Sequence, residues 1–209
     1  MFRGPEVSRW HAWQYDPYKI VVYEAFLAFC GALLAEERFD LLGQALSKPY
    51  LVRREETSGG RTTSDFSIFN TYAESLTRRT QRLKLNRIDL QADLMEEAHR
   101  NANPSFEDMM QADFILLLRS SLADQEPTRG WYPRSLVFAG RRFRPFDVFA
   151  RCESRAYFNT FSSHVLGGAT LEQFKATIGA VASTTRNWFD YNGLAVAHLA
   201  NRDNLGLRE

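Results

Sequence analysis

Three charged residues in the C-terminal half loosely follow the pattern of a metal-dependent nuclease. That pattern is a carboxylate, a gap and then Glu-x-Lys, in which the carboxylates bind a divalent cation that positions water. Asp147, Glu153 and Arg155 occur in this order, but arginine stands in the place of lysine. Arginine stays charged and is a poor proton acceptor, and in a helix Asp147 and Glu153 would lie nearly two turns apart. We therefore interpret them as surface charges of an amphipathic helix, with a metal nuclease as the alternative.

Other catalytic motifs are absent from the sequence. The histidines are isolated from one another, none follows an arginine at the spacing of one family of helical ribonucleases, and there is no H-E-x-x-H or C-x-x-C. Residues 59–63 are glycine-rich but lack the lysine of a phosphate-binding loop, and Ser162-Ser163-His164 lacks a G-x-S-x-G elbow. We expect no metal, no cofactor and no catalytic residue, so the protein is predicted not to be an enzyme. A site assembled from distant residues is the alternative.

The composition is that of a folded protein, but its charges are segregated. The 209 residues are 44% hydrophobic and 24% charged with a net charge of +1, which excludes a disordered chain and a strongly basic nucleic-acid coat. Residues 78–87 contain five basic residues and no acid, and residues 129–155 contain seven arginines against two acids. Between them, residues 89–113 contain seven acids against one base. The near-neutral total is therefore a sum of opposing blocks.

These blocks allow two functional interpretations. In the first, arginines pair with the acidic block inside the fold or across a protein interface, because the guanidinium binds carboxylates bidentately. In the second, residues 129–155 form a positive surface whose interleaved aromatic rings stack on nucleic-acid bases. A buried aromatic core with a solvated arginine rim is the third, non-functional alternative. The candidate contact residues are Arg78, Arg79, Arg82, Arg87, Arg129, Trp131, Arg134, Arg141, Arg142 and Arg144.

The sequence also predicts a compartment. Cys30 and Cys152 lie far apart in apolar surroundings, and we expect both to be buried free thiols. The N-terminal residues have charges and a proline where a signal peptide needs an apolar core. The longest apolar run, residues 25–35, is too short to span a bilayer. We therefore expect a soluble cytoplasmic protein with no membrane contact.

Hydrophobic periodicity predicts a mainly α-helical fold. Residues 16–47 are expected to form one long helix, apolar on most sides and hence central to the core. Within it, Gly31 and Gly43 mark either close packing or a break. Residues 49–55 are expected to be a short strand or an extended connection, and residues 57–64 a flexible loop.

Further helices are predicted along the rest of the chain. Ser105 with Asp108, and Thr170 after a glycine pair, are expected to cap two of them. Residues 135–139 are ambiguous between a strand and a helical turn. Together these elements predict a single helical domain over residues 1–209, with six to eight helices and at most a small β element. A division into two sub-lobes, residues 1–103 and 104–209, is the alternative. The other predicted helices lie at residues 68–83, 88–99, 146–161 and 188–199.

Three stretches, residues 37–40, 105–114 and 131–140, resemble helical regions of poorly characterised bacterial proteins often encoded with multi-component anti-phage defence systems. The resemblance covers roughly residues 17–185 and carries over no catalytic residue. It implies an accessory helical module beside ATPase, nuclease or other effector subunits.

We therefore expect a non-catalytic scaffold subunit that binds protein partners, or further copies of itself, in a larger bacterial complex. A nucleic-acid-binding module that uses residues 129–155 is the alternative.

Overall fold

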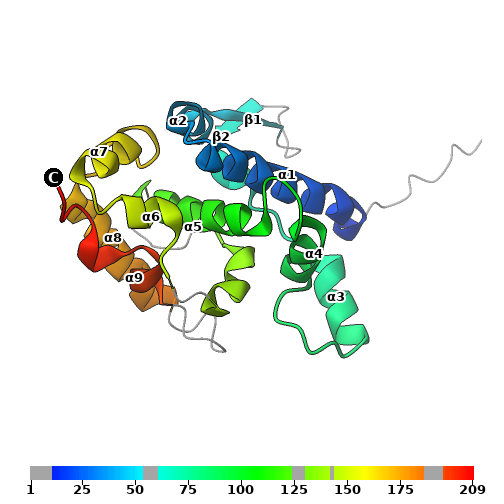
Figure 1. Ribbon diagram of the computed structural model, residues 1–209. Helices are drawn as coiled ribbons and strands as arrows, with labels where there is room; N and C mark the ends of the chain where they lie inside the picture. The colour runs from blue at the N-terminus through cyan, green and yellow to red at the C-terminus, as the bar shows by residue number, and fades with distance from the viewer. Residues whose placement is uncertain (1–10, 54–60, 124–129, 142–143, 186–194) are drawn as a thin grey trace, which may run out of the picture.

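The computed structural model describes residues 11–53, 61–123, 130–141, 144–185 and 195–209 (Figure 1). Within these ranges the protein is mainly α-helical, with eight helices of seven or more residues and a two-stranded antiparallel sheet. The predicted fold class is confirmed. The α-helices are α1 (Asp16–Ala35), α2 (Phe39–Ser47), α3 (Glu74–Arg82), α4 (Leu90–His99), α5 (Phe106–Ala123), α6 (Asp147–Arg151), α7 (Arg155–His164), α8 (Leu171–Thr184) and α9 (Val196–Leu199). The remaining elements are β1 (Tyr50–Arg53), β2 (Arg61–Ser64), and the 3₁₀ helices η1 (Ala12–Tyr15), η2 (Phe66–Phe69), η3 (Arg134–Arg141) and η5 (Arg202–Asn204).

The central helix is α5, not the expected helix over residues 16–47. Residues 106 and 109–118 are all buried, because α1, α8 and η3 pack around α5. Figure 1 shows α5 between α1 on one side and α8 on the other. The closest approach to α1 is at Gly31, where an added Cβ would lie 3.1 Å from the backbone carbonyl carbon of Asp108. Gly31 therefore marks close packing.

The predicted single helix over residues 16–47 is wrong. The chain turns between α1 and α2, where Glu37 adopts a left-handed conformation with φ of 50°. Gly43 does not cause this break. It lies inside α2, where an added Cβ would be 2.2 Å from the carbonyl oxygen of His164, so it lets α2 approach the end of α7. The helix breaks because α2 must fold back onto α7, a long-range requirement.

The helix predicted over residues 146–161 is also divided. It forms α6 and α7, which are separated at residues 152–154. Ser154 caps α7 and pairs with Arg208 in an isolated bridge, so the C-terminal residues occupy the gap.

The small β element forms from one stretch predicted as a strand or extended connection and from part of the predicted loop. Residues 61–64 of the predicted loop form β2, with Tyr50 opposite Ser64, and the predicted extension at residues 50–53 forms β1. The ambiguous residues 135–139 lie in η3. Of the helix predicted over residues 188–199, only α9 lies within the described residues.

The capping predictions at Ser105 and Thr170 are confirmed. Ser105 and Asp108 bond reciprocally at the start of α5, with Ser105 N donating to Asp108 Oδ2 at 2.9 Å. Thr170 and Gln173 form the same capping box at the start of α8. Both cysteines are free and buried, as predicted, and burial raises the pKa of each thiol.

One helix, Trp13–Ala35, is long and apolar enough to cross a membrane by length and composition alone. A core helix passes the same test, and one face of α1 packs against α5.

Candidate functional site

A buried carboxylate joins α1, α5 and η3. Asp113 on α5 accepts hydrogen bonds from Tyr23 Oη at 2.9 Å, Trp131 Nε1 at 2.7 Å, and Ser135 N and Oγ at 2.9 and 2.6 Å. Burial raises the pKa of Asp113 to about 6, although the hydrogen bonds act in the opposite direction. Asp113 and its partners Tyr23, Trp131 and Ser135 are wholly buried, so this cluster joins three elements in the interior of the fold.

Arg134 extends this cluster toward the surface. Its backbone N–H donates to Tyr23 Oη at 3.2 Å, and its Nη1 donates to Asp89 Oδ2 at 2.9 Å. The guanidinium lies 5.4–5.9 Å from the ring centroids of Tyr23, Tyr72 and Tyr132. Asp89 also caps α4, so the Arg134–Asp89 pair fixes the start of α4 against η3.

A cavity of about 510 Å³ opens between α3, the start of α4 and η3. Its walls include Tyr72, Tyr132, Gln91 and Arg134. Two buried nitrogens of these residues, Gln91 Nε2 and Arg134 Nε, have no hydrogen-bond partner in the described structure. The residues lining the cavity are therefore both aromatic and polar, although these two nitrogens are themselves buried.

The outer face of α1, by which we mean Tyr18, Val21, Val22, Ala25 and Phe29, is exposed and apolar. Four of its side chains are large and 42–71% exposed. These positions lie within one third of the helix circumference. The opposite face carries the buried residues Tyr23, Phe26, Leu27, Cys30 and Leu34. Helix α1 thus has two apolar faces, and only one is covered within the described chain.

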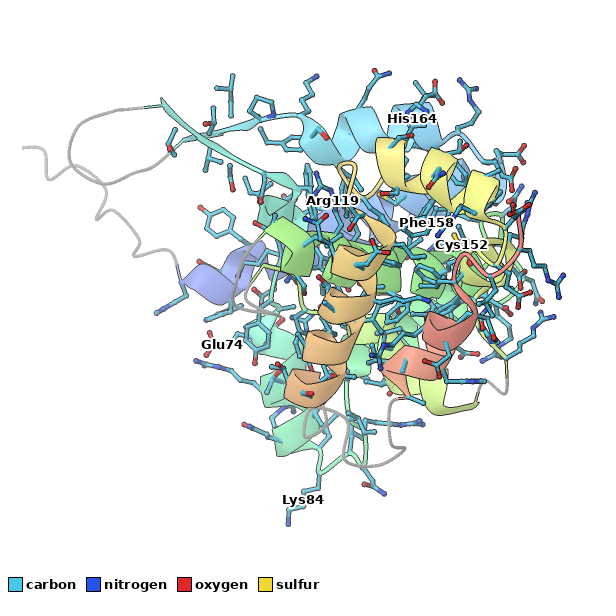
Figure 2. The ribbon with its side chains drawn as sticks, turned by 90° about the vertical axis from the view of Figure 1, so that its left-hand side faces the viewer. Glu74, Lys84, Arg119, Cys152, Phe158 and His164 are labelled. Atoms are coloured by element: carbon cyan, nitrogen blue, oxygen red, sulfur yellow. The ribbon has the colours of Figure 1, made fainter. Side chains whose placement is uncertain are left out.

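Three arginines of the first basic block lie on α3, which has no buried residue. Ser75 N donates to the buried Asp16 at 2.6 Å, which anchors the start of α3 to the start of α1. A groove of about 660 Å³ then runs between Trp13 and the arginines Arg78, Arg79 and Arg82. Figure 2 shows Lys84, just beyond α3, pointing away from the rest of the molecule.

The structure separates the candidate contact residues into two groups. Arg78, Arg79 and Arg82 are exposed on α3, and Arg87 and Arg144 are exposed elsewhere. Trp131 and Arg134 are buried. Arg129 and Arg142, and the side chain of Arg141, lie outside the described residues.

The burial of Trp131 contradicts the expectation that the aromatic rings of residues 129–155 form a nucleic-acid surface. Its ring is wholly buried and stacks on Tyr23, and Phe146 and Phe149 are also buried, so bases cannot stack on these rings. The prediction of Trp131 as a surface contact is wrong, because the ring fills the junction around Asp113. Arg134 is likewise occupied inside the fold.

Some arginines of both basic blocks pair with the acidic block, as the first interpretation expected. These pairs are Arg134–Asp89 at 2.9 Å, Arg87–Asp93 at 3.6 Å and Arg144–Glu107 at 3.8 Å. Only the first is largely buried, whereas the other two are more exposed and contribute little to stability. Arg78 pairs with Glu74 inside α3, whereas Arg79 and Arg82 have no ion pair with a described residue.

The nuclease-like residues are not gathered into a site. Glu153 pairs with Arg208 at 3.1 Å and accepts a hydrogen bond from Asn201. Within the described ranges, no group of three or more metal-binding side chains is present. The Ser162 hydroxyl donates to the carbonyl of Ala169 at 2.6 Å, an ordinary structural contact.

Sequence reasoning missed the outer face of α1 and the cavity beside Arg134. The first had a signal, since α1 is apolar on more sides than one packing partner covers. The second had none, because it forms only where Tyr132 and Arg134, which lie far along the chain from α3 and α4, meet those two helices. No family model matches the chain, and searches of curated proteins and of solved structures also returned no match.

Proposed function

We propose that this protein is a non-catalytic subunit of a larger bacterial complex, and that a protein partner covers the outer face of α1. The observation that carries the proposal is the exposure of Tyr18, Val21, Val22 and Phe29 on one face of a 20-residue helix. Contiguous apolar surface of this kind marks interaction sites in soluble proteins.

The outer face belongs to a helix that is held in a fixed position. The other side of α1 is held by Tyr23 and Leu27, both fully buried, and by the close contact of Gly31 with α5. A partner helix can therefore pack on α1 without an ordering cost in this protein.

The neighbouring charges favour a partner with acidic residues. The α3 groove adjoins Trp13, just before α1, and Arg79 and Arg82 form no ion pair with a carboxylate of the described residues. We therefore assign as partner an amphipathic helix whose apolar residues face α1 and whose acidic residues face α3. The resemblance to accessory proteins of anti-phage systems favours an effector subunit of such a system as the protein that supplies it.

The proposal is tested by purification from the native host with two matched variants. Val21→Glu combined with Phe29→Glu places charges on the outer face of α1 and is expected to fold but to lose a stoichiometric partner. Leu51→Glu changes a residue that is 72% exposed on β1 and is expected to retain it.

A photocrosslinker at Val22 should join the same partner, whereas one at Leu51 should not. A wild-type chain that purifies alone and forms no crosslink would contradict the proposal. A dimer that the double variant dissociates would identify a second copy as the occupant instead.

Nucleic-acid binding is the second candidate, and the α3 groove favours it. Trp13, 43% exposed, lies beside three arginines, an arrangement that suits stacking of a base next to phosphate contacts. Arg79→Glu combined with Arg82→Glu should then weaken binding of a single-stranded oligonucleotide. The dependence of the binding constant on salt concentration should become shallower, by the contribution of about two phosphate contacts. Arg38→Glu, on an exposed arginine outside α3, is the control. No retention of DNA or RNA at low salt would remove this candidate.

A further inference from the structure

Four exposed residues of α1 follow the spacing of a coiled-coil helix. They are separated by four, three and four positions, and are Tyr18, Val22, Ala25 and Phe29. Heptad positions a and d, which face the partner in a coiled coil, have this spacing. The three large side chains are 42–71% exposed. We call these four residues the heptad seam, and they lie on the uncovered face of α1.

The shape of the heptad seam selects the side chains of its partner. Ala25 is small and lies between the larger Val22 and Phe29, so the space for an inserted side chain is greatest beside Ala25. In knobs-into-holes packing, a large side chain of the partner fills such a space. Helix α1 is held against α5 by the buried Leu27 and the close contact at Gly31, so this space exists before a partner binds.

The N-terminal end of α1 is positive. Ser75 N donates to Asp16 at 2.6 Å, so α3 begins beside the first turn of α1 (Figure 1). Helix α3 carries Arg79 and Arg82, which are exposed and have no ion pair with a described residue. The N-terminus of α1 adds the positive end of a helix dipole. This end therefore attracts negative charge.

The C-terminal end of α1 is negative. Glu36 directly follows α1, seven positions after Phe29, and so continues the line of the heptad seam. It is exposed and has no ion pair with a described residue, and the nearby Arg38 pairs with Asp40 at 3.5 Å. The last carbonyl groups of α1 add the negative end of the helix dipole. This end therefore attracts positive charge.

We infer that the partner helix of the proposed function pairs with the heptad seam through its own a and d residues, one of which is large and lies over Ala25. Its end near Arg79 and Arg82 is acidic, and its end near Glu36 is basic. The pairing rests on the proposed function, because it specifies the partner of the same surface.

The test uses two synthetic helical peptides, each about three heptads long, with leucine at every a and d position. In the polarised peptide, glutamates occupy the remaining charged positions at one end and lysines those at the other end. In the mixed peptide, the same residues alternate along the whole length. Both peptides are fluorescently labelled and titrated with the full-length protein, and binding is followed by anisotropy.

The polarised peptide is expected to bind about tenfold more tightly than the mixed peptide at low salt, because about three of its charges then face opposite charges. The difference should shrink at high salt, since exposed charges are screened. Glu36→Lys should reduce the preference for the polarised peptide about threefold, because one favourable pair is lost.

A matched pair of alanine substitutions tests the heptad seam itself. Ala25→Glu places a charge in the seam and should weaken binding of both peptides by at least about tenfold. Ala180→Glu, at an exposed position on α8, is the control and should bind both peptides as the wild type does.

Equal binding of the two peptides at low salt would overturn the inferred charge pattern, and undiminished binding by a folded Ala25→Glu variant would overturn pairing at the seam. Should that variant fail to fold, the wild-type titrations still decide. If neither peptide binds while Val21→Glu with Phe29→Glu still loses the native partner, the heptad pairing is wrong and the proposed function stands. A wild-type chain that purifies alone contradicts the proposed function itself, a result obtained without the peptides.

Discussion

The hydroxyl of Tyr23 on α1 lies 2.9 and 3.1 Å from the two carboxylate oxygens of Asp113 on α5. Ninety residues separate the pair along the chain, and both side chains are wholly buried. Trp131 and Ser135 complete the same cluster, so one carboxylate connects the two longest helices with η3. The stability of this junction should depend on the protonation and exact shape of Asp113.

The first prediction concerns pH. Burial raises the pKa of Asp113 from 3.8 to about 6, so the folded state binds this proton more tightly than the unfolded state does. The resulting stabilisation is complete below about pH 4 and is lost as the pH rises through 6. The difference corresponds to about 3 kcal/mol in the free energy of unfolding. Urea unfolding between pH 4 and 7, compared with Asp113→Asn, should show this loss in wild type only. Parallel pH profiles would contradict it.

The second prediction concerns two glycines in helices. Gly43→Ala should destabilise the protein by about 1–3 kcal/mol, because the new Cβ would collide with the carbonyl oxygen of His164. Gly179→Ala on α8 has no atom within 4 Å of the new Cβ and should stabilise by about 0.5–1 kcal/mol through helix propensity. Thermal unfolding of both variants measures the difference. Equal shifts of the same sign would show that α2 does not pack against α7 in this way.

The third prediction concerns the anchor of α3. Asp16 accepts hydrogen bonds from Lys19 Nζ at 2.7 Å and from Ser75 N at 2.6 Å. Although burial opposes ionisation, these bonds lower the pKa of Asp16, so its stabilisation is present above the unfolded value of 3.8 and is lost as the pH falls below it. Asp16→Asn should speed hydrogen exchange of the Ser75 amide at neutral pH.

The matched control for Asp16→Asn is Asp40→Asn. Asp40 is exposed and lies 3.5 Å from an exposed arginine, a pair that contributes little. Its substitution should leave exchange at Ser75 unchanged. Unchanged exchange in Asp16→Asn as well would contradict the anchor.

The fourth prediction separates structure from binding at Trp131. Trp131→Phe loses the hydrogen bond to Asp113 and part of a stacked ring, and should cost about 2–4 kcal/mol of stability. It should not alter nucleic-acid retention at temperatures where the variant is folded, since the ring never reaches the surface. Denaturant unfolding and an oligonucleotide binding assay provide the two readouts. Lost binding by a folded Trp131→Phe would restore the earlier interpretation of this residue.

Local signals along the chain were sufficient for much of the helical framework. The cap at Ser105 and the capping box at Thr170 depend only on residues three positions away, so their sequence signatures are reliable. The thiols of Cys30 and Cys152 are buried because their neighbours are apolar. Such features need no knowledge of the rest of the fold.

Features that depend on distant partners were misjudged. Arg134 belongs to an arginine-rich block and looked like a surface contact, but Asp89, 45 residues earlier, neutralises it inside the fold. The break at Glu37 has no glycine or proline to signal it, and follows from the packing of α2 on α7. The cavity beside Gln91 exists only because α3, α4 and η3 meet.

The amino-acid sequence by itself determined that this protein is mainly helical, because periodicity, caps and glycine stops act over a few residues. It also determined that α1 is apolar on nearly every side. Only the tertiary structure decided which face of α1 is buried, since Tyr23 and Leu27 on one face and Val21 and Phe29 on the other satisfy the same hydrophobic pattern. The choice comes from the match of Gly31 and Tyr23 to α5, through close backbone contact and the buried Asp113.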